Sequence, residues 1–327
     1  MLTIAIPSFN RHGKLLKTLN SLYLFKGNLP IKVIVVDNFS TPPISDYLLE
    51  NKYSGFDYTE IFRNNGNIGA SANVLMCFAY AKSEWMWLLG DDDLPLSNCL
   101  NSIFSEIKKA DEDDFLIKFN SHAGGFPDFD TTIYNEEEFI KFCANFSYYS
   151  NMLFISNSIF RVNSMQRNLR VMFEYTSTMS PHIIGILNNV SENRHIKIVN
   201  CIITEHGIAQ EGETWNWHRL SEGVLYFFDV KGHTLFKTEM VRKLFQNYIN
   251  PNRFYGSLFV YSFRFKNYSI DYWRWYYLKS SFLFSGIKSV YLLFLSKTIK
   301  YYFSSRLINF IISKIIKSNP IAYLERC

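Results

Sequence analysis

An apolar run that ends in three acids constrains this chain more than any other stretch. Residues 85–89 read Trp-Met-Trp-Leu-Leu, and Gly90 and three consecutive aspartates, residues 91–93, follow them before Pro95. Such a run is typical of a strand buried on both faces. Three carboxylates at its end repel one another unless a cation lies among them. Because Asp is also a good cap and turn residue, an acidic turn that caps the next helix explains the same residues.

Strand-like and helix-like segments alternate through the first two hundred residues. The predicted strands are residues 2–6, 31–36, 58–62, 85–89, 115–120, 158–162 and 196–204. The predicted helices include residues 15–23, 70–81, 100–107, 165–173 and 181–188, and one that begins at Asn135 with Glu138 in a capping box. This alternation predicts an α/β fold, with a mostly parallel central sheet flanked by helices.

Polar residues follow three of these strands directly. Asn10 and Arg11 come after the first strand, Asp37 and Asn38 after the second, and residues 91–93 after the fourth. In parallel sheets ligands bind beyond the carboxyl ends of the strands, so three clusters are expected to converge on one edge. Carboxylates bind Mg²⁺ or Mn²⁺, usually together with substrate phosphates. The sequence therefore favours a metal and diphosphate site over a simple acidic turn.

The carboxyl-terminal third has a different character. From about residue 220 the alternation gives way to long helical patterns, and residues 251–327 hold twelve Lys or Arg against two Asp or Glu. Basic amphipathic helices suit the surface of an anionic bilayer, although a helical cap with solvated lysines explains the same pattern. A nucleic-acid partner is not expected, because the apolar content exceeds what a phosphate-binding surface needs. No uncharged apolar run reaches about 18 residues, so a peripheral protein is predicted.

Four short motifs, in this order and on these elements, resemble one known family. They are Pro7-x-Phe9-Asn10, Asp37-Asn38, Asn67-x-Gly69, and the apolar strand that runs into the aspartates. Together they resemble the GT-A family 2 glycosyltransferases, and more narrowly the bacterial enzymes that build O-antigen or capsular polysaccharide repeats. The resemblance is closest over residues 1–120 and extends in outline to about residue 210.

The resemblance implies a division of the chain and a place for it in the cell. Residues 1–219 would form the GT-A domain, with a nucleotide-sugar half at residues 1–120 and an acceptor half at residues 121–219. Residues 220–327 would form a helical, membrane-associating region. Such an enzyme would lie peripherally on the cytoplasmic face of the inner membrane. The five scattered cysteines, which suggest reduced thiols, agree with a cytosolic setting.

The resemblance also implies contacts with a nucleotide. Pro7, Phe9 and Asn10 would shape the loop beneath the nucleoside, and Arg11 would lie near the phosphates. Asp37 would accept a hydrogen bond from the edge of the base, most often uracil.

Further residues would support the same nucleotide. Asn38 would support Asp37. Asn67 and Gly69 would lie along the nucleotide, with Asn73 on the helix behind them.

The aspartates would be the Asp-x-Asp metal motif for Mn²⁺ or Mg²⁺. Gly90 stands where a common form of the motif, Asp-x-Asp-Asp, has its first acid. We favour Asp93 as the direct metal ligand and Asp91 for the ribose or the metal, with Asp92 close behind. His206 is a further candidate for the metal or the diphosphate, and a loop histidine of no catalytic role is the alternative.

The implied reaction is inverting transfer of a sugar from a nucleoside-diphosphate sugar, most often a UDP-sugar, to a lipid-linked oligosaccharide of the undecaprenyl type. A general base must take the proton of the acceptor hydroxyl. Glu174 is the first candidate and His182 the second. Alternatively, Glu174 is a solvated helix residue without a catalytic role, and His182 is a residue at the start of a helix after Pro181.

Three other functions are weighed against the same pattern. A sugar nucleotidyltransferase would need a glycine-rich phosphate loop after the first strand, where no glycine precedes Gly13. An NAD-dependent enzyme is disfavoured because Gly66-x-x-Gly69 lacks the full dinucleotide fingerprint. A third possibility is a membrane-bound scaffold that keeps the fold but has lost its catalytic activity. Gly90 in the place of an acid and the unassigned general base favour this scaffold, whereas the complete cluster of aspartates argues against it.

Overall fold

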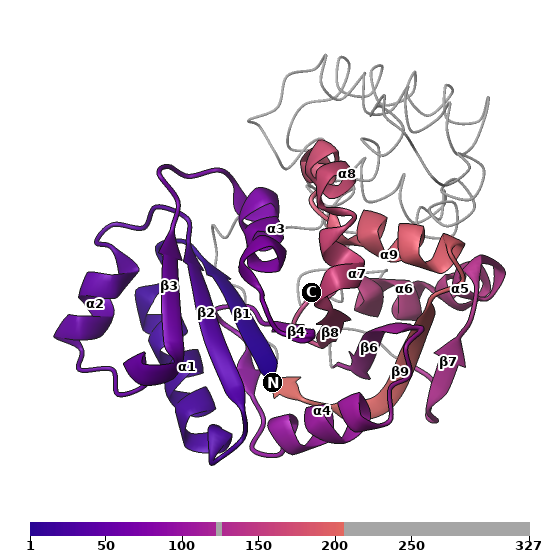
Figure 1. The fold of residues 1–327 in the computed structure, drawn as a ribbon, viewed down its shortest axis with the longest axis horizontal. Coiled ribbons are helices and arrows are strands. Elements are labelled where there is room, and N and C mark those ends of the chain that lie inside the picture. The colour runs from indigo at the N-terminus through magenta and orange to yellow at the C-terminus, as the bar shows by residue number, and fades with distance from the viewer. Residues whose placement is uncertain (122–125, 206–327) are drawn as a thin grey trace, which may run out of the picture. The chain divides into compact units, whose positions relative to one another are not determined.

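A single eight-stranded sheet forms the centre of the protein (Figure 1). The computed structural model describes residues 1–121 and 126–205, which belong to one compact unit. The strand order is β3-β2-β1-β4-β8-β6-β9-β7. The strands are β1 (Leu2–Ser8), β2 (Ile31–Asp37), β3 (Thr59–Arg63), β4 (Trp85–Leu88), β6 (Asp114–Asn120), β7 (Thr131–Ile133), β8 (Ser158–Arg161) and β9 (His195–Ile202).

Six of these strands run in one direction. β1 pairs in parallel with β2 and with β4, β2 pairs in parallel with β3, and β6 pairs in parallel with β9. Two strands run in the opposite direction. β8 lies antiparallel between β4 and β6, and β7 is antiparallel to β9. A separate two-stranded ribbon joins β5 (Leu94–Pro95) to β10 (Thr204–Glu205). The predicted α/β fold with a mostly parallel sheet is confirmed.

Helices cover both faces of the sheet (Figure 1). On one face lie α1 (His12–Lys26), α2 (Ile44–Glu50) and α4 (Cys99–Lys108). On the other lie α3 (Ala70–Tyr80), α7 (Val162–Gln166), α8 (Leu169–Glu174) and α9 (His182–Ser191). The remaining described helices are α5 (Glu136–Cys143) and α6 (Phe146–Leu153), with short 3₁₀ turns η1 (Phe56–Tyr58) and η2 (Thr176–Thr178).

The central strands are apolar because both of their faces are covered. In β1, Leu2, Ile4 and Ile6 pack in the core cluster that includes α1 and α4, while Ala5 is buried on the opposite face. Each such aliphatic side chain contributes about 1.5–3 kcal/mol when fully buried. This burial fixes the register of β1 against β2 and β4, and so fixes which residues emerge at the carboxyl edge.

The structure corrects one predicted helix and confirms a predicted cap. The single helix expected over residues 165–173 is two helices: α7 ends at Gln166 and α8 begins at Leu169. Asn168, which lies between them, donates its side-chain amide to the Ser164 carbonyl (2.9 Å). At α5, Asn135 accepts from the Glu138 backbone N–H (3.0 Å), as the capping box predicts. The Glu138 carboxylate accepts from the Tyr134 N–H (2.9 Å).

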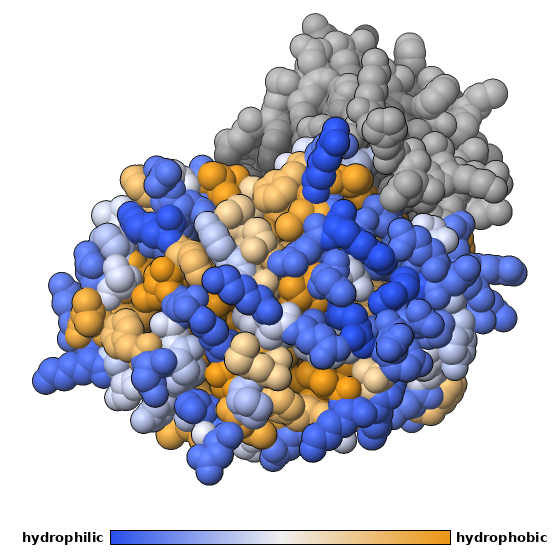
Figure 2. Space-filling view, viewed as in Figure 1, coloured by the Kyte–Doolittle hydropathy of each residue, from blue (hydrophilic) through white to orange (hydrophobic). Residues whose placement is uncertain are grey.

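Several predictions fall on residues outside the described part. His206 and the predicted helical region at residues 220–327 are among them. Among the described residues, no helix combines the length and apolar character needed to cross a bilayer. On the face drawn in Figure 2, hydrophilic side chains separate several small groups of apolar ones.

Candidate active site

The carboxyl ends of β1, β2 and β4 meet at one edge, as predicted. Ser8, the last residue of β1, donates its hydroxyl to Asp91 Oδ2 (2.6 Å). Arg11, just beyond β1, contacts Asp91 and Asp92 with one nitrogen, 3.1 Å from an oxygen of each. The Asn10 backbone N–H donates to the Ser40 hydroxyl (2.9 Å) in the loop after β2. Three segments far apart in sequence therefore build one polar edge.

Two of the three aspartates are almost completely buried. Asp91 and Asp93 are each 5% exposed, and Lys14 lies 3.5 Å from the more open Asp92. Burial raises the pKa of Asp91 to about 6, although the Ser8 hydroxyl and the Arg11 guanidinium act in the opposite direction. The side chains around Asp91 therefore replace only part of its lost hydration, which favours a further cation at this point.

Asp93 is held by a residue from the far side of β4. The Ser156 hydroxyl donates to Asp93 Oδ2 (2.5 Å) and accepts from the Gly90 backbone N–H (2.8 Å). A Cβ at Gly90 would lie 2.6 Å from the same Asp93 oxygen. The absence of a side chain at residue 90 thus allows the Asp93 carboxylate to fold back over the turn.

The aspartates do not cap the next helix. The N-cap of α4 is Asn98, five residues beyond Asp93, and it makes no side-chain capping bond. The hydroxyl of Thr18 on α1 donates instead to the Asp91 carbonyl (3.2 Å), which ties the turn to the helix after β1. The cluster forms a turn, but the prediction that it caps the next helix is wrong.

Asp37 lies at the end of β2 and is fully buried. Its Oδ1 accepts from the Ser40 N–H (2.8 Å), and its Oδ2 accepts from the Ile44 N–H (3.4 Å) and from Arg63. The carboxylate therefore organises the loop after β2. Its proposed contact with a base stays a prediction.

Four asparagines link β2 to the loop before α3. Asn38 donates to Asn67 Oδ1 (2.8 Å) and accepts from Asn64 (3.1 Å) and from the Ile68 N–H (3.0 Å). Asn64 also donates to Asn73 Oδ1 (2.9 Å), whose amide reaches the Val36 carbonyl (3.0 Å).

This amide network has a clear effect on the loop. It shapes the backbone from residue 64 to Gly69, which adopts φ +86° at the start of α3. Asn38 and Asn73 therefore hold this loop to β2, and their expected roles at a bound nucleotide stay predictions.

The loop after β1 is similarly fixed. Asn10 has φ 55°, a left-handed conformation that Asn tolerates, and its side-chain oxygen accepts from the Thr41 N–H (2.8 Å). Pro7 lies within β1, opposite Val36 of β2. Phe9 is 39% exposed, so its ring is open to a ligand at this edge.

The two candidate bases lie in different environments. Glu174, at the end of α8, is partly exposed and lies 3.7 Å from Arg170. His182 is buried at the start of α9, and burial together with the nearby Lys118 lowers its pKa to about 3. An imidazole with this pKa binds a proton too weakly for base catalysis near neutral pH.

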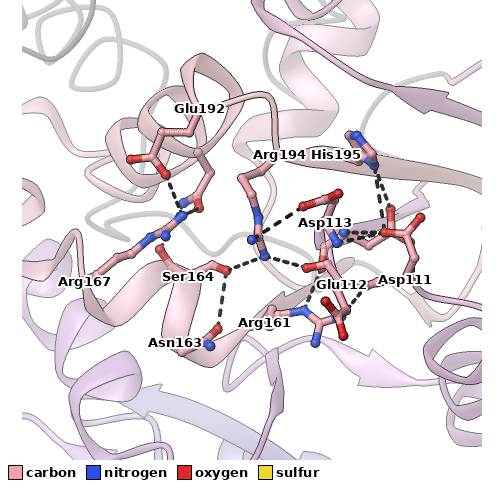
Figure 3. A network of polar contacts seen from close by, with 12 residues as sticks. Asp111, Glu112, Asp113, Arg161, Asn163, Ser164, Arg167, Glu192, Arg194 and His195 are labelled. Atoms are coloured by element: carbon pink, nitrogen blue, oxygen red, sulfur yellow. Dashed lines mark hydrogen bonds and ion pairs between the residues drawn. The ribbon is translucent and has the colours of Figure 1, made fainter.

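A second polar group lies at the opposite edge of the sheet (Figure 3). Asp111, Asp114 and His195 each offer one ligand atom, and these atoms lie within 4.8 Å of one another. Asp114 and His195 begin the parallel strands β6 and β9, so this group stands at the amino edge, away from residues 91–93. Asp114 is also 3.8 Å from Lys197. The group is therefore not part of the site at the carboxyl edge.

Sequence reasoning missed three residues of the site. Ser8 is the last residue of a strand, Arg63 immediately follows the predicted third strand, and Ser156 precedes β8. Arg63 had no sufficient signal, because its ion pair with Asp37 depends on the pairing of β2 with β3. Ser156 had none, since its approach to Asp93 depends on the antiparallel placement of β8 beside β4.

Known proteins resemble this chain in sequence. Residues 3–161 match the model of Glycosyl transferase family 2. A Mycoplasma genitalium protein described as an uncharacterized glycosyltransferase is 26% identical over 119 residues, a match that spans 36% of this chain and 40% of that protein.

Solved structures show the same fold. The crystal structure of S. aureus TarS 1–349 in complex with UDP-GlcNAc has a TM-score of 0.58 and 13% identity, over 86% of this chain and 80% of that one. A second TarS crystal structure has a TM-score of 0.57, over 89% of this chain and 50% of that one. The expected GT-A fold is confirmed, and residues 3–161 of this chain are similar to Glycosyl transferase family 2.

Proposed function

We propose that this chain is an inverting, metal-dependent glycosyltransferase that moves a sugar from a nucleoside-diphosphate sugar to a lipid-linked oligosaccharide. The observation that carries the proposal is the acid cluster, residues 91–93, in which Asp91 and Asp93 are buried at the carboxyl edge of the sheet, within the region that matches family 2. A UDP-sugar is the favoured donor. The related fold of TarS was crystallised with UDP-GlcNAc, which supports a nucleotide sugar as the ligand class.

The residues of this edge fit a divalent cation. Asp91 and Asp93 are buried carboxylates from one short turn, and the raised pKa of Asp91 reflects hydration that its neighbours do not replace. Carboxylate oxygens are the ligands that Mn²⁺ and Mg²⁺ prefer. We assign Asp93 as the direct ligand and Asp91 to the metal or the ribose, with Asp92 beside them. A bound cation would supply charge that stabilises the diphosphate leaving group.

The side chains around the cluster can position the donor. Arg11 and Lys14 carry positive charge next to Asp91 and Asp92, where the phosphates of a donor would lie. Asn67 and Phe9 are exposed at the same edge and can contact the nucleoside. These groups bind and orient the donor, so the anomeric carbon is presented to the acceptor in a defined direction.

A general base must accept the proton of the attacking hydroxyl. We propose Glu174 for this role, because its carboxylate is partly exposed and therefore accessible to an acceptor. His182 is a poorer candidate, since it is buried and its pKa is lowered to about 3. Inversion follows when the acceptor attacks on the face opposite the diphosphate.

The acceptor and the membrane belong to the same proposal. A lipid-linked acceptor in O-antigen or capsule synthesis would be met at the cytoplasmic face of the inner membrane. The twelve basic residues between 251 and 327 support attraction to anionic lipid, at about 1 kcal/mol for each one near the surface. Sedimentation of the full chain with anionic vesicles should fall as salt is raised. Equal binding to neutral vesicles would contradict this part of the proposal.

Transfer itself is the decisive experiment. The purified full chain is incubated with UDP-, GDP-, dTDP- and CDP-sugars, a lipid-linked acceptor and Mn²⁺, and the glycosylated product is measured. Asp93→Ala should lower the rate about 100-fold or more, because a metal contributes several kcal/mol to the transition state. Asp46→Ala, an exposed acid on α2, is the matched control and should leave the rate unchanged.

Two results would contradict the proposal. Full activity of a folded Asp93→Ala variant would remove the metal assignment. Absence of product with every donor, from a wild-type protein shown to be folded, would favour the inactive scaffold.

A further inference from the structure

Three side chains with metal-binding atoms meet at the amino edge of the sheet. Asp114 begins β6 and His195 begins β9, and the two residues are register partners in this parallel pair. Asp111 lies in the segment between α4 and β6. One ligand atom from each of the three residues lies within 4.8 Å of the other two. The group therefore brings the segment before β6 to the start of a strand that is distant in sequence.

The His195 ring points toward the two carboxylates (Figure 3). Its Nδ1 lies 3.9 Å from Asp111 Oδ1 and 3.9 Å from Asp114 Oδ1. Both distances exceed the range of an N–H···O hydrogen bond, about 2.7–3.2 Å. Within residues 1–121 and 126–205, this nitrogen is buried and has no hydrogen-bond partner. Such an atom is rare in a folded protein, and a cation between the three groups would satisfy it.

The backbone and a neighbouring ring orient the imidazole and the Asp114 carboxylate. Asp114 pairs with His195 and Leu116 pairs with Ile196, so β6 contains one extra residue at this point. A bulge of this kind changes the direction of a side chain and is common beside functional sites. The Tyr134 ring packs edge-on against the His195 ring, with centroids 5.0 Å apart. The side chains therefore face one another because of the local fold and not through chance contact of mobile groups.

The carboxylates have partners of their own. The Asp111 N–H donates to Asp114 Oδ2 (2.9 Å), and Lys197 lies 3.8 Å from the same oxygen, so Oδ1 is the oxygen that remains for a ligand. Asp111 Oδ1 accepts from the backbone N–H groups of Asp113 and Asp114 (2.9 Å each). Hydrogen bonds of this kind orient metal ligands. The Asp114 side chain is 4% exposed and that of Asp111 is 67% exposed, so an ion can enter past Asp111.

The size of the group fits a transition-metal ion. Three atoms that lie within 4.8 Å of one another surround a point about 2.8 Å or less from each. Zinc binds imidazole nitrogen and carboxylate oxygen at about 2.0–2.2 Å, so inward movements of less than about 1 Å would complete the contacts. Imidazole suits zinc and related ions, whereas Mg²⁺ and Ca²⁺ prefer oxygen ligands alone. One nitrogen and two carboxylates therefore favour an ion of the zinc class.

We propose that Asp111, Asp114 and His195 bind a divalent transition-metal ion of the zinc class, with water completing its coordination. The ion joins the amino ends of β6 and β9 and stabilises their pairing. It lies at the edge of the sheet opposite to residues 91–93, so it serves the fold and takes no part in the proposed sugar transfer. The alternative is a protonated imidazole that forms ion pairs with the two carboxylates and binds no metal.

The zinc content of matched variants tests the proposal. The purified full chain is freed of metal with EDTA, loaded with Zn²⁺ and passed through gel filtration, and its zinc is measured by elemental mass spectrometry. His195→Gln and Asp114→Asn should each retain one Zn²⁺ fewer per chain than the wild type. Asp113→Asn is the matched control, because Asp113 lies on the same turn but its carboxylate is 3.8 Å from Arg194. This variant should retain as much zinc as the wild type.

Affinity and stability supply a second readout, measured in Asp93→Ala to remove the acid cluster as a competing site. His195→Gln added to this background should weaken Zn²⁺ binding by about 100-fold or more in calorimetry, because loss of merely an outer partner of a ligand already costs about 10–100-fold. Zn²⁺ should raise the melting temperature of Asp93→Ala by several degrees, and the added His195→Gln should remove this rise.

Four results would overturn the proposal. They are a wild type that retains no Zn²⁺, an unchanged zinc content in folded His195→Gln and Asp114→Asn, an equal loss in Asp113→Asn, and a loss of all zinc in Asp93→Ala. Thermal unfolding shows which variants are folded, and Asp114→Asn alone decides the test if His195→Gln is not. Because zinc is counted without a sugar donor, failure of sugar transfer would contradict the proposed function and not this inference.

Discussion

Ser156→Ala tests whether the orientation of Asp93 controls metal binding. The Ser156 hydroxyl is fully buried, donates to Asp93 Oδ2 and accepts from the Gly90 N–H. Removing it deletes a hydrogen bond to a charged group, which contributes about 1.5–3 kcal/mol. Loss of the partner that orients a metal ligand typically lowers metal affinity by about 10–100-fold. We therefore expect weaker metal and metal-dependent nucleotide binding from a protein that is still folded.

A second buried serine supplies the control. The Ser121 hydroxyl donates to Asn151 Oδ1 (2.6 Å), a contact of similar length that does not involve the acid cluster. Mn²⁺ titrations, followed by calorimetry with UDP present, are compared for Ser156→Ala and Ser121→Ala, and thermal unfolding reports the stability of each. Both variants should lose stability, but only Ser156→Ala should require more Mn²⁺. An unchanged Mn²⁺ requirement in Ser156→Ala would refute the view that Ser156 positions Asp93.

Two further predictions concern the same edge and the core. Gly90→Ala places a Cβ 2.6 Å from Asp93 Oδ2, so it should displace the carboxylate and weaken Mn²⁺ binding as Ser156→Ala does. The double variant should lose less Mn²⁺ binding free energy than the two single variants together. Additive losses would show that the two residues act separately. Burial lowers the pKa of His182 to about 3 in the folded protein, whereas the pKa in the unfolded chain is about 6.5. Below pH 6.5 the unfolded chain therefore binds a proton that the folded protein does not bind. The free energy of unfolding should fall by about 2 kcal/mol between pH 6.5 and pH 5 for this reason. Denaturant unfolding of wild type and His182→Gln should therefore converge or cross between pH 6.5 and 5, and parallel curves would contradict the assignment.

Local patterns predicted the elements that depend on local chemistry. The apolar runs of β1, β2 and β4 were visible because strands covered on both faces carry few polar residues. The convergence of Asn10, Asp37 and the aspartates was also predictable, since parallel strands end at a common edge. The Asn135 cap was readable from four residues of sequence.

Contacts between distant segments were not predictable in this way. The ion pair of Arg63 with Asp37 depends on the pairing of β2 with β3, and the contact of Ser156 with Asp93 depends on an antiparallel strand inserted beside β4. Periodicity indicates that a segment is a strand, but it does not indicate its neighbours. The same limit applies to the contact of Asp37 with Arg63 and to the space that Gly90 leaves for the Asp93 carboxylate.

The position of β8 links residues beyond 120 to the acid cluster. β8 pairs with β4 on one side and with β6 on the other, so it closes the sheet next to the strand that leads into the acid cluster. Ser156, two residues before β8, reaches Asp93, and the Trp87 indole of β4 donates to the Ser156 carbonyl (2.7 Å). A chain cut at residue 120 would leave the edge of β4 unpaired and Asp93 without its hydroxyl partner. The family model extends to residue 161, the last residue of β8, so the matched region includes the strand whose placement beside β4 brings Ser156 to Asp93.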